Sequence, residues 1–255
     1  MAQMSKPLHE VRDRFFRQES TDNPLNLLDL ETSLPPVVPG FLEGENCQLL
    51  RRVRGAALMG SSAERMAASG EDWSKWRNVI EWGVVSEGGN NTGPHMDSHG
   101  YPTWLTVQEG DVGFAWMSRP SRQEEAEWMS HPDSHVAGEW RFVVLSPGQT
   151  VFFPPGTIHL VFRIRGVQTY AQGGHILQWS DLLRWLEVVI AQMQNMDSTN
   201  EDMASSAPQL VHLVERLVKN RIRAGRVEEL GGREAVERFL ALVKVVYFPS
   251  QRGTS

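Results

Sequence analysis

The chain has 255 residues, of which 40% are hydrophobic, and this length suits one large domain or one domain with an appendage. Its formal net charge of −6 argues against non-specific nucleic-acid binding as the main activity. A single cysteine, Cys47, excludes an internal disulfide, and neither a membrane-spanning run nor a signal-peptide core is visible, so we expect an intracellular protein of the nucleus or cytoplasm.

The N-terminal part of the sequence is rich in loop signals. Residues 34–40 contain three prolines and cannot form a regular helix. We therefore expect residues 1–72 to form an irregular arm around a β-barrel core at residues 73–179. That core begins at residues 73–82 with a helix or strand that carries buried tryptophans.

The central part of the sequence is typical of short strands separated by turns. Aromatic and β-branched residues predict strands at residues 82–85, 103–107, 112–117, 140–145, 150–153 and 158–163. The turn at residues 108–111 suggests that its two flanking strands form a hairpin. This spacing of strands and Gly/Pro turns favours an all-β barrel or jelly roll.

A polar segment, residues 118–139, interrupts these strands. It contains several acidic residues and the histidines His131 and His135. We interpret it as a solvated surface loop, with a lid or substrate-contact loop as the alternative.

From Ser180 onward the hydrophobic period is helical, and residues 180–255 are predicted to form a C-terminal helical region. Ser180 is a candidate N-cap for the first helix, and two further helices are predicted at residues 208–224 and 233–247. The first helix has an apolar surface that could pack on the barrel or form a seam between two copies, made by Trp179, Leu182, Trp185 and Leu186. The basic run at residues 216–226 is interpreted as a solvated helix face.

Three residues have the spacing of a metal site. On a strand, residues i and i+2 point to the same face, so His95 and Asp97 can reach one ion, and His159 would come from a second strand. Two neutral imidazoles and a carboxylate can bind Fe(II) and leave positions open for a co-substrate and O2. His99 lies two residues after Asp97 and could share its face. The alternative is that these are ordinary core residues; the Gly-rich loop before His95 and the Pro-Pro-Gly-Thr turn before His159 argue against it.

These stretches belong to a series of motifs with a characteristic order, namely Glu81–Val84, Thr92–Asp97, Val144–Gln149, Pro154–His159 and Gly173–His175. From about Trp82 to Trp179 the sequence resembles the JmjC-type cupin oxygenases, especially short fungal JmjC-domain proteins. The resemblance implies a mainly β fold with α-helices, whose double-stranded β-helix (jelly-roll) core binds Fe(II) and the co-substrate 2-oxoglutarate.

The resemblance also implies roles for individual residues. His95, Asp97 and His159 would be the metal ligands and the catalytic set. Thr92 would hydrogen-bond a carboxylate of 2-oxoglutarate, and His175 would lie near the carboxylate on the metal side.

One position departs from the family pattern. Val112 stands where most relatives have a lysine that pairs with the far carboxylate of 2-oxoglutarate, and a buried carboxylate without a cation is costly. Arg163 is the candidate replacement, because it has the same parity as His159 on one predicted strand, and Arg165 is the reserve. The alternative is that both arginines are solvated at a strand end.

We therefore expect an Fe(II)- and 2-oxoglutarate-dependent dioxygenase that hydroxylates or demethylates a protein side chain or a small molecule. Two alternatives remain open. One is a catalytically inactive JmjC-fold binding or scaffold protein, and the other is a metal-dependent cupin that does not use 2-oxoglutarate. The resemblance allows a homodimer through the C-terminal helices, and we expect neither membrane association nor direct nucleic-acid binding.

Overall fold

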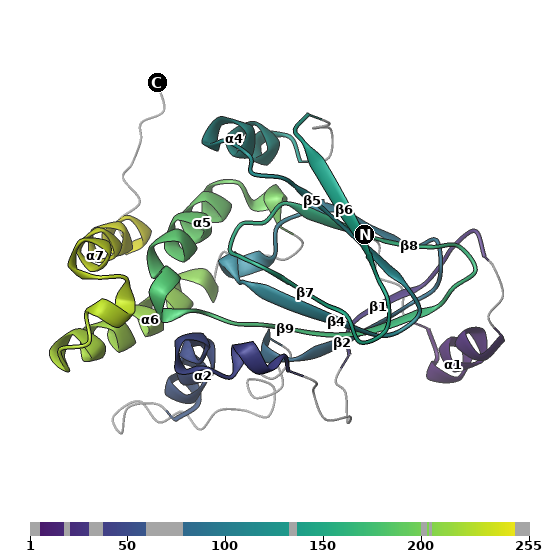
Figure 1. The fold of residues 1–255 in the computed structure, drawn as a ribbon, viewed down its shortest axis with the longest axis horizontal. Coiled ribbons are helices and arrows are strands. Elements are labelled where there is room, and N and C mark those ends of the chain that lie inside the picture. The colour runs from purple at the N-terminus through teal and green to yellow at the C-terminus, as the bar shows by residue number, and fades with distance from the viewer. Residues whose placement is uncertain are drawn as a thin grey trace.

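The computed structural model describes residues 6–17, 21–30, 38–59, 79–132, 137–199, 203 and 206–247. Two antiparallel β-sheets face each other, and most of the α-helices gather at one end of the strands (Figure 1). The prediction of a β core accompanied by helices is confirmed. The predicted boundary between arm and core, at residues 72 and 73, lies outside the described residues, as do Trp73 and Trp76.

The strands are distributed over the two sheets in a nested order. The larger sheet has the order β1 (Asn26–Leu30), β2 (Trp82–Ser86), β9 (Thr169–His175), β4 (Thr103–Glu109) and β7 (Thr150–Phe153). The smaller sheet has the order β3 (Asn91–His95), β8 (His159–Arg163), β5 (Val112–Met117) and β6 (Trp140–Leu145). Thus β5 pairs with β6, β4 with β7, β3 with β8 and β2 with β9, all antiparallel.

The predicted hairpin between β4 and β5 is wrong, because the two strands lie in different sheets. β4 pairs with β7 and β9, whereas β5 pairs with β6 and β8. The turn between them crosses from one sheet to the other at Gly110, whose φ is 72°. A side chain there would place its Cβ 2.1 Å from the carbonyl oxygen of Gln168, so the close approach also requires glycine. Turn residues indicate where the chain reverses, but they do not indicate which partner a strand takes.

Residues 118–139 are not simply a solvated loop, because they include the helix α4 (Arg122–Ser130). Ser121 and Glu124 form a reciprocal capping box, in which each side chain accepts a hydrogen bond from the backbone N–H of the other residue. Trp128 is fully buried and packs, with Met129, in a small cluster completed by Met96, Met117 and Ile158. The segment is therefore anchored to the core close to Met96, which lies between two of the predicted metal ligands.

The histidines of that polar segment were predicted to lie on the surface. His131 is exposed, as predicted. His135 lies outside the described residues.

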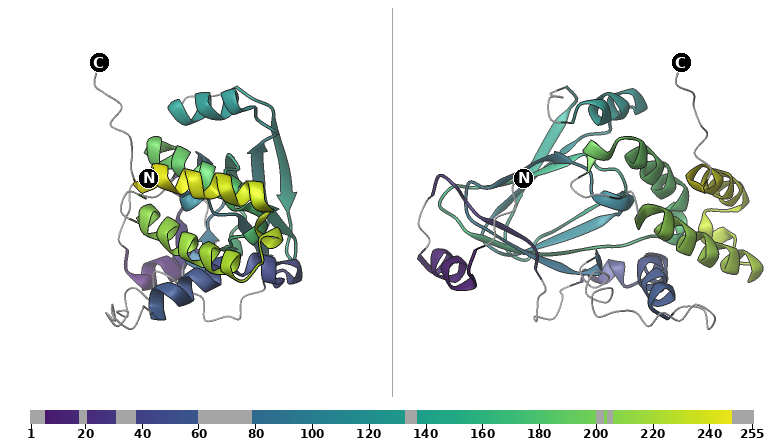
Figure 2. Two further views of the ribbon diagram at one scale, coloured as in Figure 1. Left: turned by 90° about the vertical axis from the view of Figure 1, so that its left-hand side faces the viewer. Right: turned by 180° about the vertical axis from the view of Figure 1, so that it is seen from behind.

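The helices α5 (Leu182–Gln194), α6 (Ser206–Arg223) and α7 (Arg233–Tyr247) confirm the three predicted C-terminal helices. Figure 2 shows them packed across one end of the sheets, with α2 (Leu49–Met59) beside them. α5 begins at Leu182, one residue later than predicted, after a short 3-10 helix at Trp179–Asp181. Ser180 is not its N-cap but exchanges two hydrogen bonds with the side chain of Asn46.

The apolar surface predicted on the first C-terminal helix packs inside the chain. Its members are buried in one core with α2, α6 and α7, namely Trp179, Leu182, Trp185 and Leu186. These side chains are therefore not available as a seam between two copies, and a homodimer through other parts of the helices stays a prediction. Within the described residues, no helix combines the length and apolar character that crossing a bilayer requires.

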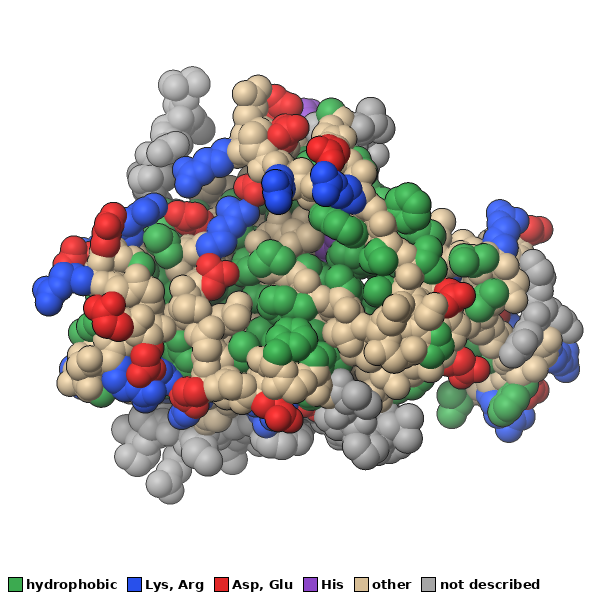
Figure 3. Space-filling model, in the orientation of Figure 1, with side chains coloured by type: hydrophobic (Ala, Val, Ile, Leu, Met, Phe, Trp, Pro, Cys, Tyr) green, Lys and Arg blue, Asp and Glu red, His purple; other side chains and the backbone are tan. Residues whose placement is uncertain are grey.

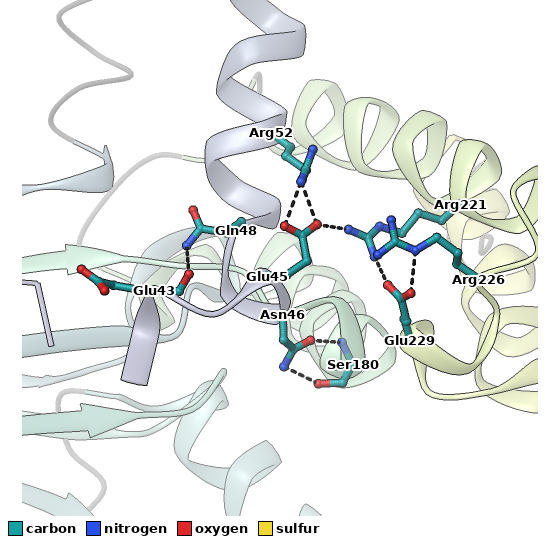
Figure 4. A network of polar contacts seen from close by, with 9 residues as sticks. All are labelled: Glu43, Glu45, Asn46, Gln48, Arg52, Ser180, Arg221, Arg226 and Glu229. Atoms are coloured by element: carbon teal, nitrogen blue, oxygen red, sulfur yellow. Dashed lines mark hydrogen bonds and ion pairs between the residues drawn. The ribbon is translucent and has the colours of Figure 1, made fainter. Parts of the chain in front are cut away.

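The basic run at residues 216–226 is not uniformly solvated, because Arg221 is buried. Its guanidinium lies 3.7 Å from the centre of a Trp179 ring and forms ion pairs with Glu45 and Glu229. Arg52 also pairs with Glu45, so α2 and α6 meet around this carboxylate (Figure 4).

The described residues also include short 3-10 helices at Gly40–Leu42, Glu45–Cys47, Ser98–Gly100, Met196–Ser198 and Glu228–Leu230.

The N-terminal arm is attached to the core through a buried carboxylate. α1 (Leu8–Arg17) lies at the end of the sheets opposite the C-terminal helices (Figure 1). Arg14 donates two hydrogen bonds to Glu87, at 2.8 and 2.6 Å, and the backbone N–H of Leu25 donates a third at 2.6 Å. These bonds hold the segment that leads into β1 against the end of β2.

Candidate metal centre

His95, Asp97 and His159 converge, and their ligand atoms all lie within 4.8 Å of one another. His95 is the last residue of β3, and His159 is the first residue of β8, directly opposite in the register. The Nε2 atoms of both imidazoles lie 3.7 Å from Oδ1 of Asp97. Asp97 follows the end of β3 in an extended conformation, so the predicted same-face geometry holds although the regular strand has ended. The cluster could hold one metal ion.

Backbone carbonyls fix which nitrogen of each imidazole faces the centre. His95 Nδ1 lies 2.8 Å from the carbonyl oxygen of Gly93, and His159 Nδ1 lies 3.0 Å from that of Thr157. A carbonyl can only accept, so each Nδ1 carries the proton and donates it. The lone pair of each Nε2 is left toward the cluster, which is the arrangement that metal-binding histidines require.

The charge states in this cluster also suit a cation. Burial, reinforced by the nearby His95, lowers the pKa of His159 to about 4. Burial alone would raise the pKa of Asp97, but the surrounding histidines His159, His175 and His95 together lower it. Near neutral pH the site therefore presents a neutral His159 and a carboxylate, the forms that bind a divalent metal.

A buried arginine lies on the same interior face as the triad. Arg163, the last residue of β8, is 7% exposed, and burial lowers its pKa to about 10. Its Nη1 donates to the hydroxyl of Thr92 at 3.3 Å and to the carbonyl oxygen of Asn90 at 3.5 Å, both long bonds. Its Nε has no hydrogen-bond partner, and no carboxylate among the described residues lies within ion-pair distance of it. Arg165, the reserve candidate, is exposed beyond the strand end.

An irregularity in β3 explains how Thr92 shares that face with His95. Residues three apart on a regular strand point to opposite faces, but the register of β3 against β8 shifts between these two residues. β3 is the first strand in the order of its sheet, which explains why Pro94, with no N–H to donate, is tolerated there. The irregularity thus lies within Thr92–His95 and brings both side chains to the cavity.

The triad and the arginine line one cavity of about 110 Å³. Its walls come from both sheets and combine polar with apolar side chains; the apolar ones include Val112, Phe114, Phe153, Val161 and Ala171. Val112 faces Arg163 directly in the β5–β8 register, so the two side chains share one face. Arg163 therefore places a cation beside Val112, on the neighbouring strand. Figure 3 shows a histidine at the floor of a hollow that hydrophobic side chains border.

His175 lines the same cavity but makes a contact that the sequence did not predict. Its Nδ1 lies 2.8 Å from the hydroxyl of Thr103, which in turn donates to Oδ2 of Asp97. The ring also stacks on Tyr101, with centroids 5.1 Å apart. Thr103 was missed because a threonine at the start of a strand carries no motif; the pairing of β4 with β9 is what brings it to His175.

His99 does not join the triad. Its φ is 56°, which turns the ring away, and its Nε2 lies 2.7 Å from the hydroxyl of Ser206. The loop around it is instead held by Gln192 of α5, which the sequence also did not predict. Gln192 donates to the carbonyl oxygen of Asp97 and accepts from the N–H of Gly100, both at 2.8 Å.

Comparisons with known proteins give a partial likeness to cupin domains. No protein-family model matches the sequence, and no curated protein is similar to it. Among solved structures, the chain is similar to the Drosophila melanogaster CENP-C cupin domain, with a TM-score of 0.29 and 11% identity over 39% of this chain and 58% of that one. A cupin superfamily protein from Desulfitobacterium hafniense matches with a TM-score of 0.26 and 8% identity, over 39% and 69% of the two chains. The DMSP lyase DddQ from Ruegeria pomeroyi matches with a TM-score of 0.24 and 15% identity, over 37% of each chain. What the cavity can bind is therefore inferred from its own side chains.

Proposed function

We propose that this protein is an Fe(II)- and 2-oxoglutarate-dependent dioxygenase of the JmjC type. The observation that carries the proposal is Arg163, a buried cation without a carboxylate partner among the described residues, in the same cavity as a His-Asp-His cluster. A buried charge without a counterion is costly, so its presence calls for an anionic ligand. A dicarboxylate that reaches the metal with one end and Arg163 with the other meets both requirements.

The arrangement of the strands supports the fold part of this proposal. An eight-stranded jelly roll folds a long hairpin so that its strand pairs are nested across two sheets, and β2 to β9 have this nested order. The metal cluster lies at the end of the β3–β8 pair, with its open side toward the space between the sheets. A double-stranded β-helix core is the interpretation that accounts for both features.

The residues divide into three tasks. His95, Asp97 and His159 would hold the metal on one face, and when bound the metal supplies the oxidative chemistry with the co-substrate and O2. Thr92 and Arg163 would bind the far carboxylate, Arg163 through its unused Nε and remaining N–H groups. The apolar side chains of the lining, such as Val112 and Ala171, would keep water away from the reacting end of the cavity.

A metal-dependent cupin that acts directly on a small carboxylate, without 2-oxoglutarate, is the second candidate. It is favoured by the size of the cavity, about 110 Å³, because a single bound acid could occupy both the metal and Arg163. The scaffold alternative is less favoured, since its main support was the missing lysine and Arg163 supplies a cation on the same face.

The two candidates are separated by anaerobic titration of the metal-free protein with Fe(II) and then with 2-oxoglutarate. The dioxygenase should develop the visible metal-to-ligand charge-transfer band only when both are present, and should convert 2-oxoglutarate to succinate in air. The His95→Ala/Asp97→Ala double variant should show neither result. Metal binding without the band would refute the dioxygenase and favour the second candidate, whereas no metal binding would refute both.

A further inference from the structure

We infer that Thr103, held by His175, is a positioning residue that makes Asp97 a one-oxygen ligand and so keeps the metal's remaining positions open. The inference rests on the proposed metal site and extends it to residues outside the ligand set. Thr103 is the first residue of β4 and is 2% exposed. Its hydroxyl donates to Oδ2 of Asp97, while the other oxygen, Oδ1, is the atom that both imidazoles face at 3.7 Å.

The two carboxylate oxygens of Asp97 therefore lie in different environments. Oδ1 points into the cluster, whereas Oδ2 is already engaged by a neutral donor. A carboxylate that bound the ion through both oxygens would have to break the bond to Thr103 in a buried setting, where losing a hydrogen bond to a charged group is expensive. It would also occupy a position that a two-point co-substrate needs.

The direction of each hydrogen bond follows from the count of protons. A threonine hydroxyl has one proton, and Thr103 gives it to Asp97, whose ionised carboxylate can only accept. The lone pair of Thr103 therefore accepts from Nδ1–H of His175, at 2.8 Å. His175 and Thr103 are directly opposite each other on β9 and β4, so the backbone pairing of the larger sheet sets this contact.

Ring contacts hold His175 in the required orientation. Its ring stacks on Tyr101 with an interplanar angle of 25°, and Trp82 packs against it at a centroid distance of 5.8 Å. A chain of contacts thus runs from His175 through Thr103 to Asp97. Partners of this kind, which orient a metal ligand without touching the ion, are worth about 10- to 100-fold in metal affinity in other sites.

The experiment replaces the hydroxyl and measures metal binding rather than turnover. Thr103→Val keeps the branched shape and removes the donor, so affinity for Co(II), used as a probe, should fall by about 10- to 100-fold. The visible Co(II) spectrum should also change, since its intensity falls as the number of coordinated atoms rises. Thr103→Ser restores the donor and should recover both the affinity and the spectrum.

Thr106→Val is the matched control. Thr106 is also a buried β4 threonine with a hydroxyl contact, 2.7 Å to Thr150, but it lies on the opposite face of the strand. It should destabilise the fold without changing Co(II) affinity or spectrum. If Thr103→Val does not fold, His175→Phe keeps the ring stack and removes Nδ1, and it should weaken Co(II) binding in the same direction by a smaller factor.

The outcomes distinguish this inference from the proposed function. If the unmodified protein does not bind Co(II), the metal site itself is refuted. If it binds and both Thr103→Val and His175→Phe bind with unchanged affinity and spectrum, the positioning role is overturned while the metal site stands. A loss in Thr106→Val equal to that in Thr103→Val would also overturn it, because the effect would then be one of general stability.

Discussion

Replacing Arg163 with methionine should make the metal-free protein more stable while removing its anion site. Burial lowers the pKa of Arg163 from the ordinary arginine value to about 10, and this lowering corresponds to roughly 3 kcal/mol of unfavourable free energy for the charged form. The folded pKa is below the unfolded value, so this cost is fully present at every pH below about 10, including neutral pH. Methionine has a similar reach and no charge, and it fits the apolar wall that Val112 and Val161 provide.

Part of this gain is offset by the contacts that the guanidinium makes. The bonds to Thr92 and Asn90 are long, at 3.3 and 3.5 Å, so each contributes at most about 1 kcal/mol. The expected net change is a rise of about 1–2 kcal/mol in the free energy of unfolding, or roughly 2–8 °C in Tm for a chain of this size.

The assay is urea unfolding of the metal-free protein, followed by fluorescence, beside a 2-oxoglutarate titration of the Fe(II)-loaded protein. Arg165→Met is the matched control, because Arg165 is exposed and its replacement should change stability by less than about 0.5 kcal/mol. A loss of more than about 1 kcal/mol in Arg163→Met would refute the reasoning. It would mean that interactions within the protein already stabilise the charge of Arg163, so that its burial does not indicate an anionic ligand.

Three further predictions concern stability. Burial lowers the pKa of His159 from 6.5 to about 4, so between these pH values the unfolded chain binds a proton that the folded chain does not. The free energy of unfolding of the metal-free protein should therefore fall by up to about 3 kcal/mol as the pH falls from 6.5 to 4. A His159→Gln variant with the same pH slope in urea unfolding would contradict this. Trp128→Ala should cost about 3–5 kcal/mol in the same assay, and a loss below about 1 kcal/mol would show that α4 is not part of the core. Arg221→Met should cost about 1–2 kcal/mol, less than a fully buried ion pair because its carboxylate partners are half exposed, and an equal loss in the exposed Arg226→Met would remove the special role of Arg221.

The sequence predicted those parts of the site that depend on local spacing. His95 and Asp97 are two residues apart, so extended backbone geometry places them on one face, and a turn motif marks His159 as the start of a second strand. The pairing of β3 with β8 then brings His159 to them. Arg163 follows from the same parity rule applied along one strand. These residues could be found because β8 is regular and the backbone stays extended from His95 to Asp97, and each inference stays within one short segment.

Contacts between distant strands and helices could not be predicted in this way. Thr103 reaches Asp97 and His175 because β4 pairs with β9, and no residue in either strand indicates that partner. The β4–β5 hairpin failed for the same reason, since both strands are buried on nearly every residue and lack the alternation of a half-exposed hairpin. α4 was missed although Ser121 and Glu124 form a readable capping box, because its polar composition dominated the interpretation.

The C-terminal helices, and not only the β core, support the candidate metal cluster. Three hydrogen bonds join the loop that carries Asp97 to α5 and the segment after it. Gln192 holds the carbonyl of Asp97, Trp185 donates to the carbonyl of His99 at 2.9 Å, and Ser198 accepts from the N–H of Met96 at 3.0 Å.

A metal-binding side chain must be positioned within a fraction of an ångström, so its backbone has to be held by several neighbouring elements. The sheets position His95 and His159 through one register pair, but Asp97 lies beyond the end of β3 and has no strand partner of its own to fix it. α5 and the segment after it provide that constraint from one side, and Thr103 provides it from the other. The C-terminal helices are therefore part of the candidate site, and shortening the chain at Ser180 should disable the cluster even though none of the three ligands would be removed.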